Sequence, residues 1–413
     1  MLISIRQTAS HLARFEIWSV AFFVAASMAW PRLLPAALGV GIIFWIIRCI
    51  AYHRLSIRTP IDGSAAVLFL TILVTLYVTA LPEITNQQSL RLLMGMILFY
   101  AIVNWTSTEK DLRLLITGTA FTGLILALAA PFSVQWAVDK LSFLPNSLYE
   151  RFTQIFSDVV HPNVLAGVLI LILPITASWL LYTWREMNWL NRILFTLTNL
   201  LILVVIIFTQ SRGAWIAVAS MLLAALLLHW RRGWIGILLI IFLSIAAIYQ
   251  FGITSILEGL ASNPTIGDFN NRMDIWFRAI YMIQDFPFSG IGMGLYKVTA
   301  DTLYPFSSTS AAGIPHAHNI FLQVGVDLGI PGLVSWLSIL IAMVLAAWQT
   351  FQYGRQSHIH WITGLGSGLL LSQVGLVIHG LTDAVVWGMV RPAPIVWGFW
   401  GITAAAIILI HKR

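Results

Sequence analysis

The sequence has 413 residues, of which 59% are hydrophobic and only 9% are charged, and its mean hydropathy is +0.87. Soluble domains carry about 25% charged residues, so this composition excludes a soluble globular protein and indicates an integral membrane protein. The net charge of +7 would suggest a nucleic-acid partner in a soluble protein. Here we attribute it to membrane topology and expect no nucleic acid.

Repeated apolar runs of about 20 residues predict helices rather than a barrel, so we expect an all-α polytopic fold of about 12 transmembrane helices. We expect a single membrane domain over residues 1–413, because no linker or internal repeat is evident. No cleavable signal peptide is evident in residues 1–30. The predicted spans lie near residues 16–30, 33–50, 64–81, 91–105, 114–132, 163–182, 193–209, 214–229, 234–251, 319–350, 361–380 and 394–410.

Lysines and arginines fall on alternate connections between these spans, from Arg6 and Arg14 through to Lys412. Because basic residues favour the cytoplasmic side, both termini are predicted to be cytoplasmic in a multi-pass inner-membrane protein. Two long connections, residues 133–162 and 252–317, then lie on the extracytoplasmic side. Long loops often carry function, so we expect the chemistry there.

The segment FTQSRGAW lies at an outer turn between two predicted spans and contains Arg212 beside Gly213. A glycine at such a turn lets a ligand approach the backbone closely. Arg212 is therefore a candidate for binding an anion at membrane depth. The alternative is an arginine that snorkels beside an interfacial tryptophan.

A second arginine lies in the long loop, where FNNRMDIWFRAI shows helical spacing with Arg272 and Trp276 on one face. Arg278 lies about 240° further round the same helix and should serve another surface. Arg272 is a candidate ligand for an anion, or alternatively a partner of Asp268. The following FPFSGIGMGLY predicts tight backbone around a site.

The segment HAHNIFLQVGVDLGIPG opens a predicted span with polar residues. Pro315 suits a helix's first turn, and from there Asn319, Gln323 and Asp327 recur every four residues as one stripe that should face the bundle interior. On such a helix His316 and His318 do not share a face, so we expect at most one in the site. The alternative for either histidine is an interfacial hydrogen-bonding role.

Further candidates lie where other spans meet the outer side. Asn163 could line the cavity, and Arg391 lies in the last outer turn. For these two residues, and for His379 and Asp383, capping and pairing at helix ends is the alternative role. We expect no metal, because the chain lacks H-E-x-x-H and cysteine pairs, and the first outer turn, WPRLLP, has no carboxylate.

Six motifs in the second half of the chain together resemble the bacterial O-antigen ligase and O-antigen polymerase superfamily. Each is weak alone, but their order is that of the superfamily. They are HPNVLAG (161–167), SRGAW (211–215), NRMDIW (271–276), FSGIGMG (288–294), HAHNIFLQVGVDLGIPG (316–332) and HGLTD (379–383).

The resemblance implies a multispan glycosyltransferase fold of the GT-C type, acting outside the cytoplasmic membrane. Such enzymes transfer a glycan from a polyprenyl-diphosphate carrier to a hydroxyl of a glycan or lipid-core acceptor. By motif, Arg212 and Arg272 would engage the diphosphate, and His318, which directly precedes Asn319, would act on the acceptor hydroxyl. His316 is an additional histidine that could compete for that role. Asn319, Trp276, Arg391 and Asn163 are the expected neighbours in the substrate site.

Chemistry and resemblance agree on these residue types. Guanidinium groups hold a diphosphate bidentately and keep their charge, so two arginines can replace a divalent metal, and no cofactor is expected. A neutral histidine can accept the hydroxyl proton, and attack opposite the leaving group would invert the anomeric carbon. The competing function is a membrane transporter of a small anion. Ligase and polymerase activities remain alternatives, because they share the donor.

Overall fold

The computed structural model describes residues 2–136, 160–229, 264–305, 314–388 and 390–412, with a few single positions between residues 147 and 250. This part of the chain is helical, apart from an isolated bridge between Val134 and Val160. The first helices are α1 (Leu2–Ala13), α2 (Glu16–Ala29), η1 (Pro31–Leu33), α3 (Leu34–Tyr52), α4 (Asp62–Val78), α5 (Pro82–Trp105) and α6 (Glu109–Ser133). The later helices are α7 (Pro162–Thr183), α8 (Trp189–Phe208), α9 (Arg212–His229), α12 (Pro264–Asp285), α13 (Tyr296–Leu303), α14 (Ile320–Gln356), α15 (His360–Gly380) and α16 (Pro394–His411).

Nine helices in the described ranges are long and apolar enough to span a membrane, and the bent pair α1 and α2, with 48° between them, would make a tenth. α4 is also apolar and has 17 residues. Each predicted span coincides with one of these helices or with α2, except 234–251, which lies outside the described ranges. The chain is therefore an all-α, multi-pass membrane protein, as the sequence predicted.

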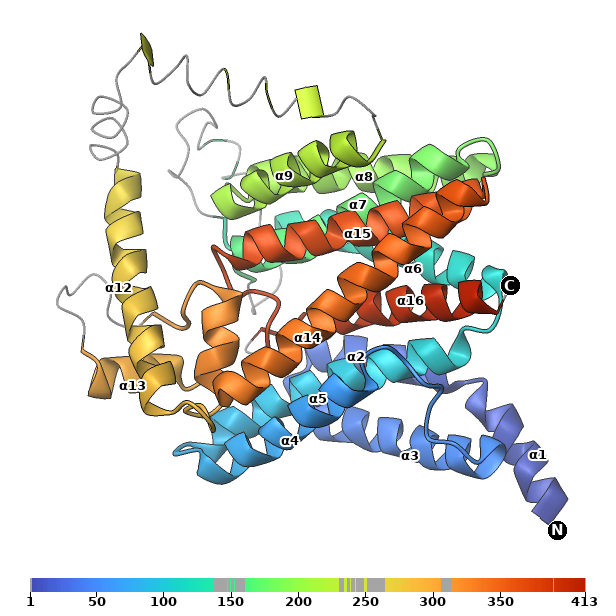
Figure 1. The fold of residues 1–413 in the computed structure, drawn as a ribbon, viewed down its shortest axis with the longest axis horizontal. Helices are drawn as coiled ribbons and strands as arrows, with labels where there is room; N and C mark the ends of the chain where they lie inside the picture. The colour runs from blue at the N-terminus through green and yellow to red at the C-terminus, as the bar shows by residue number, and fades with distance from the viewer. Residues whose placement is uncertain are drawn as a thin grey trace.

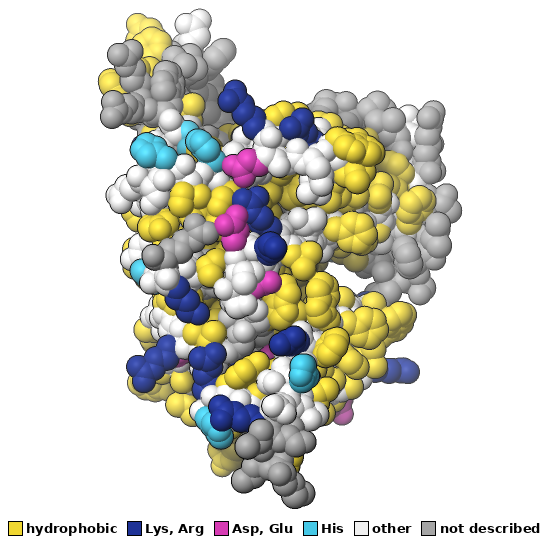
Figure 2. All heavy atoms as spheres, turned by 90° about the vertical axis from the view of Figure 1, so that its right-hand side faces the viewer, with side chains coloured by type: hydrophobic (Ala, Val, Ile, Leu, Met, Phe, Trp, Pro, Cys, Tyr) yellow, Lys and Arg dark blue, Asp and Glu magenta, His cyan; other side chains and the backbone are white. Residues whose placement is uncertain are grey.

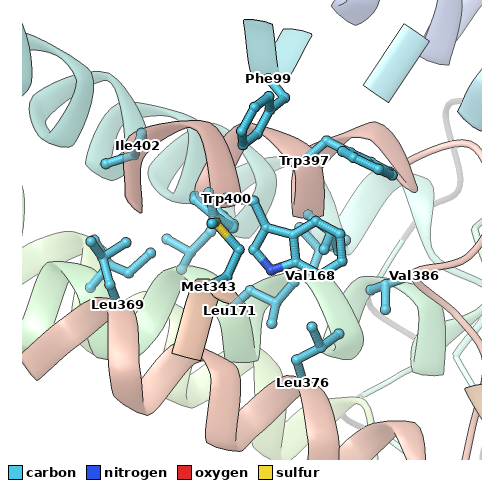
Figure 3. Close-up of a cluster of buried hydrophobic side chains, with 14 of the residues drawn as sticks. Phe99, Val168, Leu171, Met343, Leu369, Leu376, Val386, Trp397, Trp400 and Ile402 are labelled. Carbon is cyan, nitrogen blue, oxygen red and sulfur yellow. The ribbon is translucent and has the colours of Figure 1, made fainter. Parts of the chain in front are cut away.

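The long helices pack along one another, with both termini at one end of the bundle and α12 and α13 at the other (Figure 1). The centre is formed by α5, α7, α14, α15 and α16, whose buried side chains include Phe99, Met343 and Trp400 (Figure 3). Glycines let α15 approach its neighbours closely. A Cβ on Gly368 would lie 2.7 Å from the Ile175 Cα of α7, and one on Gly366 would lie 2.3 Å from the Phe351 N of α14.

The helix α14 is broken near its start, where the sequence predicted one continuous span. Gly329 has φ 70° and ψ −175°, so residues 320–328 form a short helix before the long one. The Ile330 N–H, displaced from the helical pattern, donates to the Pro287 carbonyl at 2.7 Å. A Cβ on Gly329 would lie 2.7 Å from that same carbonyl oxygen, so this position requires glycine both for its φ and for its close contact.

Basic side chains gather at the end of the bundle that holds both termini, which we call the basic end. Figure 2 views this end and shows lysines and arginines spread across its face between hydrophobic margins. Helix ends there contribute Arg54, Lys110, Arg185, Arg355 and Lys412. We call the opposite end, with α12, α13 and the start of α14, the site end. These five residues lie on connections that the sequence predicted to share one side of the membrane.

Candidate functional site

The segment between residues 314 and 319, at the site end, is not helical. α14 begins at Ile320, and Asn319 is its N-cap, with Oδ1 accepting from the Phe321 and Leu322 N–H groups at 3.0 and 3.1 Å. The prediction that Pro315 lies in the first turn was therefore wrong by about one turn. His318 has φ 46°, a left-handed conformation that turns the chain just before the helix.

This turn brings both histidines into one site, which corrects the expectation that at most one would enter. The ring centroids of His316 and His318 lie 4.2 Å apart. The His318 backbone N–H donates to His316 Nδ1 at 3.1 Å. The expectation failed because it assumed helical spacing, whereas the histidines lie on a bent segment. His316 is buried, and His318 is half-buried.

Asp383 joins the two histidines to α7. Its Oδ1 lies 3.5 Å from both His316 Nε2 and His318 Nδ1. Asn163 Nδ2, in the first turn of α7, donates to Asp383 Oδ2 at 3.0 Å, and the Ala384 N–H donates to Oδ1 at 2.8 Å. Asn163 therefore contacts the same carboxylate as the two histidines. Its Oδ1 is buried without a hydrogen-bond partner among the described residues.

The charges in this group favour an ionised carboxylate and a neutral histidine. Burial alone would raise the pKa of Asp383, but the close approach of His318 and the charges of His316 and His379 hold it below its ordinary value. Burial lowers the pKa of His316 to about 4, with Asp383 opposing and His318, His161 and Arg272 reinforcing the effect. At neutral pH His316 is thus uncharged beside a charged Asp383.

The loop from Leu381 to Asp383 positions Arg272 and Asn319. Arg272 Nη1 donates to the Thr382 carbonyl at 2.8 Å, and Asn319 Nδ2 donates to the Leu381 carbonyl at 3.3 Å. Arg278 instead donates to the Tyr304 carbonyl at 2.6 Å, so the two arginines of α12 serve different surfaces, as predicted. The Asp268 side chain, the alternative partner of Arg272, lies outside the described residues.

Arg212 is the first residue of α9, next to the same loop. A Cβ on its neighbour Gly213 would lie 2.3 Å from Thr382 Oγ1, so the start of α9 packs directly against Thr382. Gln210, with φ 50°, turns the chain between α8 and α9. The Arg212 side chain is exposed and makes no hydrogen bond or ion pair with the described part of the chain. The start of a helix favours anions, and so does the free guanidinium.

Trp276 and Arg391 have neighbours other than the histidines. Trp276 packs against a small apolar cluster at the site end that includes Ile275 and Tyr296. Arg391, half-buried before α16, is close enough to Arg91 of α5 to interact with it electrostatically. Sequence reasoning missed Arg91, which is buried within a predicted helix and carries no motif.

The predicted polar stripe along α14 faces the bundle interior, where Gln323 and Asp327 form hydrogen bonds with other groups of the protein. Gln323 Nε2 donates to Asp327 Oδ1 at 2.9 Å, and the Trp387 Nε1–H donates to Asp327 Oδ2 at 2.7 Å. The Gly294 N–H, from the FSGIGMG turn, also donates to Asp327 Oδ1, at 3.0 Å. The glycine-rich turn therefore braces the short helix that begins α14.

Comparison with known families finds a match for one segment of the chain. Residues 197–337 match the family model Wzy_C, described as O-antigen ligase. This segment of the chain is similar to the O-antigen ligase family. The match covers about a third of the chain and confirms the resemblance to the ligase and polymerase superfamily. No curated protein matches the chain.

The matched segment contains only part of the site. Arg212, Arg272, Trp276, His316, His318 and Asn319 lie within residues 197–337. Asn163, Thr382 and Asp383 lie outside it, and the contacts described above bring them to the histidines. The sequence singled out Asp383 through HGLTD, with capping or pairing at a helix end as its alternative role. What was missed is that this carboxylate contacts both histidines.

The same three side chains could hold a metal ion. One ligand atom from each of His316, His318 and Asp383 can be chosen so that all three lie within 4.8 Å of one another. Two histidines and a carboxylate are a donor set that zinc accepts. This set was not predictable from sequence, because its members come from a bent segment and a distant loop.

Proposed function

We propose that this protein transfers a glycan from a polyprenyl-diphosphate carrier to an acceptor hydroxyl, with His318 as the general base. The observation that supports this is that His318, Asp383 and Arg272 meet at one loop, in a chain whose residues 197–337 match the O-antigen ligase model. The site lies at the end opposite the basic end. Under the positive-inside rule, it faces away from the cytoplasm.

His318 suits the role of base better than His316. His316 Nδ1 accepts the His318 N–H, so a neutral His316 carries its proton on Nε2, toward Asp383. Both of its nitrogens are then used within the protein. His318 directs Nδ1 toward Asp383, which favours the proton on Nδ1 and leaves Nε2 as the basic atom. The side chain of His318 is 25% exposed, against 10% for His316.

The arginines supply the charge for the leaving group. Arg272 uses one N–H group on Thr382, and a guanidinium has five, so it retains donors for phosphate oxygens. Arg212, with a free guanidinium at the start of α9, is the second cation. Together they would stabilise the negative charge that develops on the departing diphosphate, without a metal. Attack by the acceptor oxygen from the opposite side inverts the anomeric carbon.

Three side chains of this site have supporting roles in the proposal. Asp383 holds His318 in one tautomer, and Asn163 and Ala384 hold Asp383. Asn319 caps α14 and ties it to Leu381, which fixes the position of the preceding His318. Because these groups touch His318 or its neighbours rather than the reacting atoms, they are positioning residues.

The test is transfer of a labelled glycan by purified protein from a polyprenyl-diphosphate donor. His318→Ala should lower kcat by about 10²–10⁴-fold, the usual contribution of a general base. Arg272→Lys should lose about 10²-fold or more, because an ammonium lacks the bidentate fork. Arg278→Lys is the matched control, since Arg278 lies on the same helix and also binds a loop carbonyl. Full activity of folded His318→Ala would reject the assignment.

A chelator tests the metal-free mechanism. Treatment with EDTA followed by gel filtration should leave the rate of transfer unchanged, because the arginines carry the charge stabilisation. Loss of activity on chelation, with recovery on adding Zn²⁺, would show instead that His316, His318 and Asp383 hold a catalytic metal. His318→Ala would then also lose bound zinc.

A further inference from the structure

Four helix ends meet around a cavity at the basic end, at the opposite end of the bundle from His316 and His318. α7, α9 and α14 end there, and α15 begins there. The cavity has a volume of about 230 Å³. Its lining comes from all four helices and their connections, and it consists of Tyr182, Leu228, His229, Gly354, Arg355, His358, His360 and Thr363.

The lining of this cavity is basic. It contains an arginine and three histidines, and no carboxylate among these lining residues. Arg355, His358 and His360 are exposed at its mouth. The Arg355 guanidinium stacks on the Phe351 ring, 5.5 Å from its centroid, which leaves the N–H groups at its edge available for hydrogen bonds. Such a lining favours an anion with several acceptor oxygens.

His229 forms the polar wall of the cavity and is held in place. The Tyr182 hydroxyl lies 2.8 Å from His229 Nδ1, and the Ser367 hydroxyl lies 3.0 Å from His229 Nε2. These contacts use both ring nitrogens, so His229 shapes the cavity rather than supplying a free donor. The free donors are those of Arg355, His358 and His360 at the mouth.

An apolar groove continues from the cavity along α7. It has a volume of about 560 Å³ and shares Tyr182 and His360 with the cavity. Its apolar walls are Leu180, Leu181 and Trp184, of which Leu181 is 78% exposed. Arg185 and Glu186 lie at its rim, and the Glu186 carboxylate is 3.4 Å from the Arg113 guanidinium, which offsets its charge.

The depth of these features matches the membrane interface. The Arg192 guanidinium lies over the Trp184 ring, 5.2 Å from its centroid, and Trp189 is exposed nearby at the start of α8. Tryptophans paired with arginines are typical of the headgroup level. The face of the basic end in Figure 2 has the same character, with basic side chains framed by hydrophobic ones. The cavity therefore lies at headgroup level and the groove borders acyl chains.

We propose that the cavity and the groove together bind one anionic phospholipid. The phosphate enters the cavity and accepts hydrogen bonds from Arg355, His358 and His360, while an acyl chain lies along Leu180, Leu181 and Trp184. A phospholipid fits better than a soluble anion because the basic cavity opens into an apolar groove on the lipid-facing side of α7. Basic pockets between membrane helices bind anionic headgroups in this way.

Such a lipid would link the basic-end termini of four helices. All four carry site residues at or near their other ends: Asn163 lies in the first turn of α7, Arg212 begins α9, Asn319 caps α14, and His379 lies one residue before the end of α15. The lipid should therefore raise the thermal stability of the bundle, since a ligand that binds the folded state alone stabilises it.

The experiment compares lipids of equal chains on purified protein in a neutral detergent. Native mass spectrometry counts bound lipid, and thermal unfolding reports stabilisation, with dioleoylphosphatidylglycerol against dioleoylphosphatidylcholine. The double variant Arg355→Gln, His358→Gln should bind phosphatidylglycerol about tenfold more weakly than the parent, because it loses charge-assisted contacts to the phosphate. Its glycan transfer without added lipid should equal that of the parent.

A matched control is available at the same end. His53→Gln, Arg54→Gln removes the same two side chains from an exposed turn that does not line the cavity, and His53 and His358 have similar positive φ values, 53° and 55°. The control should keep full affinity for phosphatidylglycerol. Equal binding of the two lipids, or equal loss in both double variants, would refute the site. Equal stabilisation by soluble glycerol phosphate would also refute the lipid and indicate a site for free anions.

Discussion

Asp383 has different neighbours on its two oxygens, and this asymmetry makes its role testable. Oδ1 faces both histidines and the Ala384 N–H, while Oδ2 accepts from Asn163. In Asp383→Asn, the side-chain amide could donate an N–H to His318 Nδ1, whereas the carboxylate only accepts. His318 Nδ1 would then have to be unprotonated. The proton would then move to Nε2, where the base is needed. We expect kcat to fall by about 10²–10⁴-fold with KM little changed.

The control for Asp383→Asn is Asp327→Asn, which also replaces a buried carboxylate at the site end but touches no histidine. Both variants should lose some thermal stability, because each carboxylate accepts several hydrogen bonds. Only Asp383→Asn should change the pH profile of kcat. An unchanged profile in folded Asp383→Asn would leave the carboxylate with a structural role alone.

His316 gives a second prediction at the residue scale, for the dependence of stability on pH. Burial lowers its pKa to about 4 in the folded protein, against 6.5 when exposed, so the unfolded chain binds a proton first as pH falls. The contribution of His316 to the free energy of unfolding is therefore fully present above pH 6.5 and is lost as the pH falls toward 4. The loss is on the order of 3 kcal/mol at most.

Thermal unfolding in detergent between pH 7.5 and pH 5 measures this loss. The parent should lose melting temperature over that range, and His316→Gln should lose clearly less. Asp383 does not interfere, because its pKa lies below its ordinary value and it stays ionised throughout. If His316→Gln had the same slope as the parent, His316 would not be buried in its neutral form.

The sequence identified individual residues better than their contacts. Arg272 and Asn163 were singled out from residue type and position, and both lie at the loop that the structure brings to the histidines. The contact of Asp383 with His316 and His318 was beyond sequence reasoning. It joins positions more than sixty residues apart, and helical periodicity describes only neighbours within one element.

At the scale of elements, the start of α14 shows why the histidine pair was misjudged. Pro315 is compatible with a first helical turn, yet the bent segment continues to Asn319, which caps the helix that begins at Ile320. A capping asparagine is a stronger start signal than a proline, and the sequence contained both. If the helix had been predicted to start after Asn319, His316 and His318 would have preceded it. Helical spacing would then not have kept the two side chains apart.

The break at Gly329 carries a prediction for this element. Gly329→Ala would place a methyl group 2.7 Å from the Pro287 carbonyl oxygen at a φ of 70°, which costs an alanine on the order of 1 kcal/mol before any clash. We expect a lower melting temperature and reduced transfer, because the short helix of residues 320–328 carries the Asn319 cap and Asp327. Thermal unfolding and the glycan-transfer assay measure both.

Gly118→Ala serves as the control for this variant. Gly118 lies within α6, and a Cβ there would meet nothing within 4 Å. Alanine favours a helix over glycine by about 1 kcal/mol, so this variant should keep or slightly raise the melting temperature. Equal stability of Gly329→Ala and the parent would mean that the break tolerates a side chain and does not depend on glycine.

At the scale of the whole molecule, hydropathy predicted the bundle well because each span is an independent apolar helix. The site end was less predictable. α12 and α13 lie in a connection that hydropathy treats as loop, and they are held by contacts such as Arg278 to the Tyr304 carbonyl and Ile291 to the Val326 carbonyl. Those contacts depend on tertiary packing, which no local pattern records.

The orientation of the molecule in the membrane is the last prediction. In a Cys49→Ala background, single cysteines replace Thr302 of α13 at the site end and Ser357 after α14 at the basic end, both exposed. Because basic residues are retained in the cytoplasm, a membrane-impermeant maleimide added to intact cells should label Thr302→Cys and spare Ser357→Cys until the membrane is opened. Cys49 is removed because it is the chain's one native thiol. The reverse pattern would place the histidines in the cytoplasm, where a carrier-linked glycan awaiting transfer outside the membrane could not reach them.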